Sequence, residues 1–291
     1  MILSTTLFGR TYQFNSVNEV MAKANEEKSG DIMAGIAAES AEERVAAKVV
    51  LANLTLEDLY NNPAIPYETD EVTRIIQDNV NEKIYQSIKN WTVEELREKI
   101  LDSDTSSNDI RRISRGLTSE MVAAVAKLMS NLDLIYGARK ITVTAHCNTT
   151  IGLEGTLSTR LQPNHPTDNE DGIVASILEG LAYGAGDAVI GLNPVDDTVE
   201  SVVRMFKKLE EIKNKFKIPT QTSVLAHVTT QMEAIRQGAP ADLIFQSIAG
   251  SEKGNTAFGI SGDLIAEAKD LALRQGTAAG PNVMYFETGQ G

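Results

Sequence analysis

Between residues 157 and 287, short apolar stretches recur, and each ends in a polar or charged side chain. The stretches cover 157–162, 188–193, 222–227, 243–248 and 283–287, and the helical patterns between them cover 172–183, 198–216, 229–237 and 262–274. Strands that alternate with helices of this length predict parallel β/α units. A closed barrel of this class has eight strands. The fold class is therefore α/β, an incomplete TIM-type (β/α) barrel with about five of the eight strands.

The segment before these strands has a helical pattern, which runs from Ser16 to about residue 131. Two helix starts have capping-box form, at Ser16 with Glu19 and at Thr92 with Glu95. We predict helices near 16–27, 40–53, 71–88, 92–101 and 118–132. The run 141–146 is too close to the next strand for a crossover and predicts a preliminary hairpin strand. The expected domains are a helical N-terminal region, 1–135, and a partial barrel that carries the active-site strand ends, 136–291.

The strand ends supply the candidate chemistry, because barrels of this class carry their active sites where the strands end. We expect these side chains to face one mouth: Arg160 with Gln162, Asn193, His227, Gln246 with Ser247, and Glu287. Simpler explanations remain open at this point. Arg160 and Glu287 could form an ion pair at the rim, and Asn193 before Pro194 could simply end a strand.

Composition narrows the class of partner. The 291 residues carry a formal net charge of −13, which argues against nucleic acid and against an anionic membrane surface. One cysteine and three scattered histidines give no metal-site spacing, so we predict no metal ligands and a reducing, cytoplasmic setting. No stretch reaches a membrane-spanning length.

The thiol of Cys147 is expected to be buried and inert, and the glycines of 184–191 are expected to form a helix-to-strand turn.

Seven separate blocks carry a specific resemblance: 5–9, 42–48, 116–120, Arg160-Leu161-Gln162-Pro163-Asn164, 186–191, 225–231 and 285–291. In these blocks the chain resembles the N-terminal part of the ethanolamine ammonia-lyase large (heavy) subunit family, whose members depend on adenosylcobalamin. Family chains continue past residue 291 into the remaining barrel strands.

The resemblance implies a radical carbon–nitrogen lyase that converts ethanolamine to acetaldehyde and ammonia. By position, it implies that Arg160 and Asn193 contact the substrate hydroxyl, and that Gln162 and Glu287 contact its amino group. Arg160 and Glu287 would be catalytic, and Pro194, Gln246 and Ser247 would lie near the cofactor. It further implies a small-subunit partner, a homo-oligomer of large subunits, and ethanolamine catabolism in the cytoplasm or within a bacterial microcompartment.

Two other functions remain as hypotheses. The first is a truncated, noncatalytic binding or assembly relative of that subunit, which would form complexes without turnover. The second is a barrel lyase that needs no cofactor. Lyase activity in the absence of cobalamin would identify the cofactor-free lyase.

Overall fold

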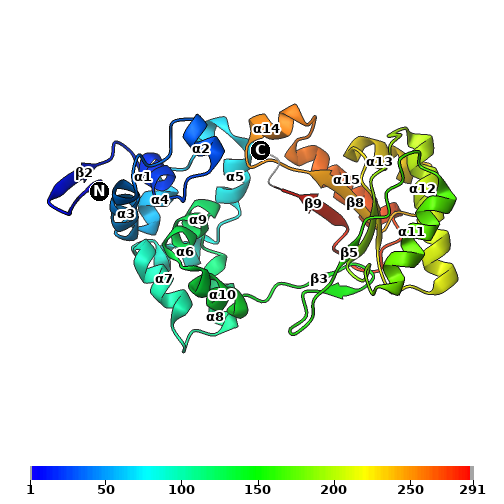
Figure 1. Cartoon of the computed structure of the whole chain (residues 1–291), viewed down its shortest axis with the longest axis horizontal. Helices are drawn as coiled ribbons and strands as arrows, with labels where there is room; N and C mark the ends of the chain where they lie inside the picture. The colour runs from blue at the N-terminus through cyan, green and yellow to red at the C-terminus, as the bar shows by residue number, and fades with distance from the viewer. Residues whose placement is uncertain (1, 289–291) are drawn as a thin grey trace. The chain divides into compact units, whose positions relative to one another are not determined.

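The structure is a computed structural model that describes residues 2–288 (Figure 1). Residue contacts divide the chain into two compact units, residues 1–142 and 143–291. Residues 289–291, the end of the last block that carries the family resemblance, lie outside the described part. In the described part, no helix is both long and apolar enough to cross a membrane.

The first unit is mainly helical. Its helices are α1 Val17–Lys23, α2 Ser29–Met33, α3 Ala41–Ala52, α4 Leu56–Tyr60, η1 Tyr67–Thr69, α5 Glu71–Asp78, α6 Glu82–Ile88, α7 Val93–Leu101, α8 Ser107–Ser114, α9 Ser119–Leu128 and α10 Asn131–Lys140. They enclose one apolar core that includes Leu51, Leu96 and Met121. The sequence predicted the helical character of this unit, but not the short helices α2, α4 and α8 or the helix α10.

Capping side chains explain several helix starts. Thr92 forms the predicted capping box, since its hydroxyl accepts from Glu95 N at 3.1 Å and Glu95 accepts from Thr92 N at 2.8 Å. Ser16 accepts from Glu19 N, but the Glu19 carboxylate bonds the backbone of Asn15 instead of that of Ser16. The predicted helix 71–88 is two helices, because Asn81 caps a new one at α6.

A β-hairpin precedes these helices and was not predicted. Strands β1 Ser4–Leu7 and β2 Arg10–Gln13 pair antiparallel through a two-residue turn at Phe8 and Gly9. Both turn residues have positive φ, 55° and 73°. Two positive φ angles match the twist of a tight hairpin, and glycine adopts them without strain.

The second unit is built on one parallel sheet of five strands in the order β5-β6-β7-β8-β9. The strands are β5 Arg160–Leu161, β6 Val189–Leu192, β7 Thr222–Val224, β8 Leu243–Ser247 and β9 Met284–Glu287. The connecting helices are α11 Glu170–Ala182, α12 Val199–Phe216, α13 Val228–Arg236, α14 Glu252–Ala257 and α15 Gly262–Gln275. This arrangement confirms the incomplete TIM-type barrel.

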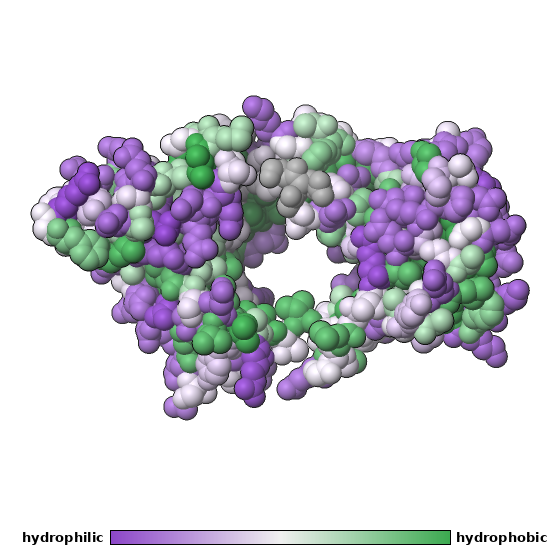
Figure 2. Space-filling view, in the orientation of Figure 1, coloured by the Kyte–Doolittle hydropathy of each residue, from purple (hydrophilic) through white to green (hydrophobic). Residues whose placement is uncertain are grey.

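One face of the sheet packs against the helices. Ile190, Leu192, Val224 and Ile244 share a buried core with α12 residues such as Phe206. Figure 1 shows α11, α12, α13 and α15 gathered on this side. Much of the surface visible on this unit is hydrophilic (Figure 2). The helix layer thus covers this face of the sheet.

A buried ion pair joins this helix layer to the strands. Lys213 Nζ on α12 lies 2.7 Å from Asp242 Oδ2, and the Asp242 side chain has no exposed surface. The same carboxylate accepts hydrogen bonds from Thr222 N, Thr222 Oγ1 and Thr277 Oγ1. A charge buried this deeply needs several partners to offset the loss of water.

A short antiparallel hairpin, β3 Ala145–His146 with β4 Thr150–Ile151, precedes the sheet. It agrees with the predicted preliminary hairpin, although its strands are shorter than 141–146. The first barrel strand is also shorter than the predicted run 157–162. There, Thr159 N bonds the Asp187 carboxylate at 2.7 Å instead of a neighbouring strand.

Candidate functional site

Residue alternation along the strands defines the face opposite the helices. Since successive side chains point to opposite faces of a strand, the burial of Ile190 and Leu192 against the helices turns Gly191 the other way. By the same rule, Phe245 and Ser247 face away from Ile244. Their register partners Tyr285 and Glu287 are on that face as well. We call it the concave face.

Arg160 lies across this concave face. Its guanidinium carbon is 5.5 Å from the centre of the Tyr285 ring, which itself packs edge-on against Phe245. Gly191 makes room for it, because a Cβ at that position would lie 3.3 Å from Arg160 Nε. Among the described residues, this buried Nε has no hydrogen-bond partner. A partly buried cation with an unsatisfied donor favours an oxygen ligand.

Asn193 connects the two polar side chains of β5. Its Oδ1 accepts from Gln162 Nε2 at 3.0 Å and lies 3.4 Å from Arg160 Nη2. Its backbone N–H donates to Asn164 Oδ1 at 2.9 Å, which fixes the end of the strand. Within the described chain, Asn193 Nδ2 and Gln162 Oε1 have no partner. The cluster therefore presents an amide donor and an amide acceptor to the open side.

The loop after Asn193 is held by a residue that the sequence analysis missed. Asp168 is 4% exposed, has φ of 50°, and its carboxylate accepts from Val195 N and Asp196 N at 2.9–3.0 Å. These bonds hold the backbone directly after Pro194, and they therefore fix the position of Pro194 next to Asn193. No local pattern marks Asp168, because its partners lie 27 and 28 residues later.

Gln246 and Ser247 are adjacent, so they face opposite sides of β8. Gln246 is 5% exposed and points to the helix side, where its Oε1 accepts from Val228 N at 2.9 Å. That bond satisfies a free N–H at the start of α13. Ser247 faces the concave side opposite Glu287. The two side chains therefore do not share one face of the sheet, and the cofactor roles of both residues remain predictions.

The three histidines have local structural contacts. His227 Nε2 lies 2.9 Å from the carbonyl oxygen of Phe258, so this nitrogen carries the proton. Its Nδ1 accepts from Thr229 N and caps α13. His165 Nδ1 accepts from Thr167 N and Asn169 N, and His146 Nδ1 is 3.0 Å from Thr150 Oγ1. Within residues 2–288, no three His, Cys, Asp or Glu side chains are grouped to hold a metal ion.

Cys147 is buried beneath the sheet. It is 4% exposed, and burial followed by the charge of Asp242 raises the pKa of its thiol to about 11. This environment agrees with an inert thiol. Gly184 and Gly186 form the predicted turn between α11 and β6, both with positive φ, whereas Gly191 lies within β6.

A cavity of about 300 Å³ lies next to Arg160, at the amino ends of the strands. Arg160, Tyr285 and Gln221 line it, together with Ala145, Cys147 and Ile151 of the hairpin. Gln221 holds the hairpin in place, because its Oε1 accepts from Asn148 N and Thr149 N and its Nε2 donates to Ala188 O. Arg160 therefore borders this cavity on one side and contacts Asn193 on the other.

Comparison with known proteins identifies the family of this chain. The family model for the ethanolamine ammonia lyase large subunit (EutB) matches residues 12–291. The chain belongs to this family. It is 57% identical, over all 291 residues, to the ethanolamine ammonia-lyase large subunits of Escherichia coli and Salmonella typhimurium. It spans 64% of the length of these curated relatives. The resemblance found in the sequence is thereby confirmed for the family.

Within this family member, the structure brings together Arg160, Gln162 and Asn193, and the register places Ser247 and Glu287 on the same concave face. Gln246 instead bonds the start of α13, and the His227 ring bonds the start of α13 and the carbonyl oxygen of Phe258. The roles of all these residues toward a ligand remain predictions.

Proposed function

We propose that this chain contributes the substrate-binding strands of an ethanolamine ammonia-lyase, which converts ethanolamine to acetaldehyde and ammonia with adenosylcobalamin. The observation that supports this function is the division of polar groups at the concave face. Arg160 and Asn193 Nδ2 offer donors, whereas Gln162 Oε1 and the Glu287 carboxylate offer acceptors. Ethanolamine at neutral pH needs both, because it has a hydroxyl at one end and an ammonium at the other.

The hydroxyl end fits the donor group. The oxygen of Asn193 already accepts from Gln162 and Arg160, so its amide nitrogen is the atom turned to a ligand. Together with the Arg160 guanidinium, it would bind the substrate oxygen and favour negative charge that develops there. Asn164 and Asp168 act as positioning residues, since they hold the backbone on either side of Asn193 and Pro194.

The ammonium end fits the acceptor group. Gln162 is held by the bond from its Nε2 to Asn193, which leaves its Oε1 to accept from an ammonium. Glu287 adds a carboxylate on the same face, two residues beyond Tyr285. A charge-assisted hydrogen bond from an ammonium to a carboxylate is roughly twice as strong as a neutral one. These contacts would hold a small substrate in one orientation.

The cofactor site is consistent with the residues at this end of the sheet. Pro194, Gln246 and Ser247 are uncharged, as suits a corrin ring bordered by amide groups, although the Gln246 side chain faces the helices, where it accepts from Val228 N. When bound, adenosylcobalamin supplies the radical that removes hydrogen from the carbinol carbon. The protein residues bind and orient the substrate and exclude water.

A reconstitution assay tests the proposal. The full chain is mixed with the family's small subunit, adenosylcobalamin and ethanolamine, and acetaldehyde and ammonia are measured in equal amounts. Omission of the cofactor tests the cofactor-free lyase, and a visible-light titration measures cofactor binding. If the subunits form a complex and bind the cofactor but produce no acetaldehyde, the noncatalytic assembly role replaces the proposal. The molecular mass of the large subunit in the same preparation tests the expected homo-oligomer. We also propose that the protein resides in the cytoplasm or within a microcompartment.

A further inference from the structure

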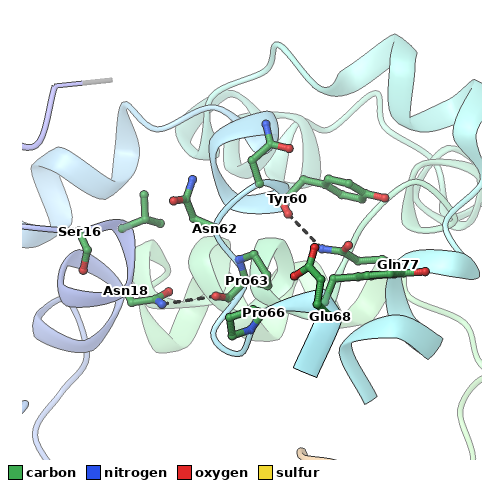
Figure 3. Close-up of a pocket in the computed structure, with 11 residues that line it drawn as sticks. Ser16, Asn18, Tyr60, Asn62, Pro63, Pro66, Glu68 and Gln77 are labelled. Carbon is green, nitrogen blue, oxygen red and sulfur yellow. Dashed lines mark hydrogen bonds between the residues drawn. The ribbon is translucent and has the colours of Figure 1, made fainter. Parts of the chain in front are cut away.

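The helical unit has a pocket of its own, of about 570 Å³. All of its lining residues belong to residues 16–77, and Figure 3 shows them: Ser16, Val17, Asn18, Tyr60, Asn61, Asn62, Pro63, Pro66, Tyr67, Glu68 and Gln77. Sites for small molecules occupy about 300 to 1,000 Å³. The volume therefore suits a ligand larger than ethanolamine.

Three amide side chains of this pocket have a defined orientation. Asn18 donates to Pro63 O at 3.4 Å, Gln77 to Tyr60 O at 3.0 Å, and Asn62 to Asp58 O at 2.8 Å (Figure 3 shows the first two). A carbonyl oxygen only accepts, so in each case the NH2 group faces the backbone. The three amide oxygens keep both lone pairs, and none has a partner among the described residues.

The charge of the pocket is negative. Glu68 contributes a carboxylate, and none of the described lining residues is Lys, Arg or His. Arg74, which does not line the pocket, donates to the backbone oxygens of Tyr67 and Glu68. Next to the pocket, Asp78 accepts from the Tyr67 hydroxyl at 3.0 Å. Burial raises the pKa of Tyr60, and the charges of Glu82 and Asp78 raise it further. Acceptors and negative charge favour a ligand that is cationic and rich in donors.

Part of the remaining lining is apolar or aromatic. Tyr60 stacks on Tyr85 with ring centroids 4.6 Å apart, and Pro63 and Pro66 restrict the chain between α4 and η1. Aromatic faces attract organic cations, and flat apolar surfaces pack against methylene groups. The pocket thus combines surfaces for an alkyl chain with acceptors for its charged ends.

We propose that this pocket binds a linear alkyl polyamine, through ammonium groups on Glu68 and on the amide oxygens of Asn18, Asn62 and Gln77. The site lies in a different unit from the concave face and does not depend on the proposed function. The same ammonium chemistry also occurs on lysine side chains of a protein, so the test includes both sources.

Calorimetric titration of the full chain with spermidine tests the site. We expect binding that Glu68→Gln weakens about tenfold, which corresponds to about 1.4 kcal/mol. Glu26→Gln is the control, since it removes the same charge from an exposed position of the same unit that does not line the pocket. Circular dichroism of each variant confirms that the fold is kept.

Two further titrants complete the test. Triethylene glycol, a neutral chain, should bind at least tenfold more weakly than spermidine. The peptide acetyl-Lys-Lys-amide carries the ammonium groups as side chains, and binding tighter than that of spermidine would assign the site to a protein partner and overturn the polyamine as its ligand. Spermidine binding that Glu68→Gln leaves unchanged, or that Glu26→Gln weakens equally, would show nonspecific attraction and overturn the site itself. The absence of any spermidine binding would also overturn the site. None of these results depends on turnover.

Discussion

Arg160 and Tyr285 are in contact, 5.5 Å from guanidinium carbon to ring centre, although they stand on opposite edge strands of the sheet. Their strands, β5 and β9, are separated by three others. An open, flat sheet would hold its edges much farther apart, since neighbouring strands lie about 4.8 Å apart. The contact therefore shows that five strands curl far enough for one long side chain to connect the two edges.

The ring of Tyr285, more than its hydroxyl, should stabilise this contact. Aromatic pairs contribute roughly 0.5–1.5 kcal/mol, and exposed cation–π pairs about 0.5–1 kcal/mol. Tyr285→Leu removes the contacts to Phe245 and Arg160, and we expect it to lower the free energy of unfolding by about 1–3 kcal/mol. Tyr285→Phe keeps the ring and should cost under about 1 kcal/mol. Urea unfolding followed by circular dichroism measures both, and equal losses would show that the hydroxyl matters instead.

Gly191 should be required for the position of Arg160. In Gly191→Ala, the new Cβ would lie 3.2 Å from Leu225 Cδ1 and 3.3 Å from Arg160 Nε. We expect a loss of stability of about 1–3 kcal/mol from overpacking, and a lower kcat/KM for ethanolamine in the reconstituted enzyme. Gly250→Ala is a matched control, because no heavy atom lies within 4 Å of its Cβ position. Identical behaviour of the two variants would contradict the steric argument.

Glu287→Gln should reduce turnover while leaving the fold intact. The amide keeps the shape of the carboxylate but loses the charge that would bind an ammonium. We expect kcat/KM for ethanolamine to fall at least about tenfold, the equivalent of about 1.4 kcal/mol. Unchanged kinetics in the reconstituted enzyme would refute the role of Glu287. Circular dichroism of the isolated chain checks that folding is retained.

Asp242 should be far more important for stability than the other acidic partner of Lys213. Burial alone would lower the pKa of Lys213, but the hydrogen bonds that its ammonium donates to Asp242 and Glu210 raise it. Asp242→Asn leaves this lysine buried without its main counter-charge and should cost about 3–5 kcal/mol. Glu210→Gln should cost about 1 kcal/mol or less, since Glu210 is 22% exposed. Urea unfolding of both variants tests the difference, and similar values would contradict it.

Cys147 should make the protein less stable at alkaline pH. The folded thiol has its pKa raised to about 11, so it stays protonated while the unfolded thiol ionises. Unfolding then releases a proton, and stability falls as pH rises from the ordinary thiol pKa toward 11, by about 2–3 kcal/mol in total. Cys147→Ala should remove this part of the pH dependence. In labelling experiments near pH 8, a thiol reagent should react with the native chain only through unfolding.

Strand and helix positions could be predicted because they depend on local pattern. The runs that became β6 and β8 are apolar and end in polar residues, and Thr92 marks its helix start directly. The hairpin β1–β2 was missed, although Phe8 and Gly9 lie between alternating residues. Period-two alternation already implies that the side chains of Gln246 and Ser247 face opposite sides of their strand.

The site was predictable only in part. The strand ends brought Arg160, Gln162 and Asn193 together, as expected, because parallel strands end at one edge. The orientation of their amides depends on hydrogen bonds between strands, which no local pattern encodes. The same holds for Asp168, whose partners are distant in sequence, and for the pocket of the helical unit, whose lining comes from separate helices.

The hairpin β3–β4 comes directly after the junction of the two units at residues 142 and 143. It is bonded to two places in the sheet unit, to Gln221 beside the central strand β7 and to Asn282 before the edge strand β9. The second unit therefore contains the hairpin that covers the amino ends of its own strands. A protease cut within 141–144 should leave these bonds intact, so that the hairpin still covers the amino ends of the strands in the second unit.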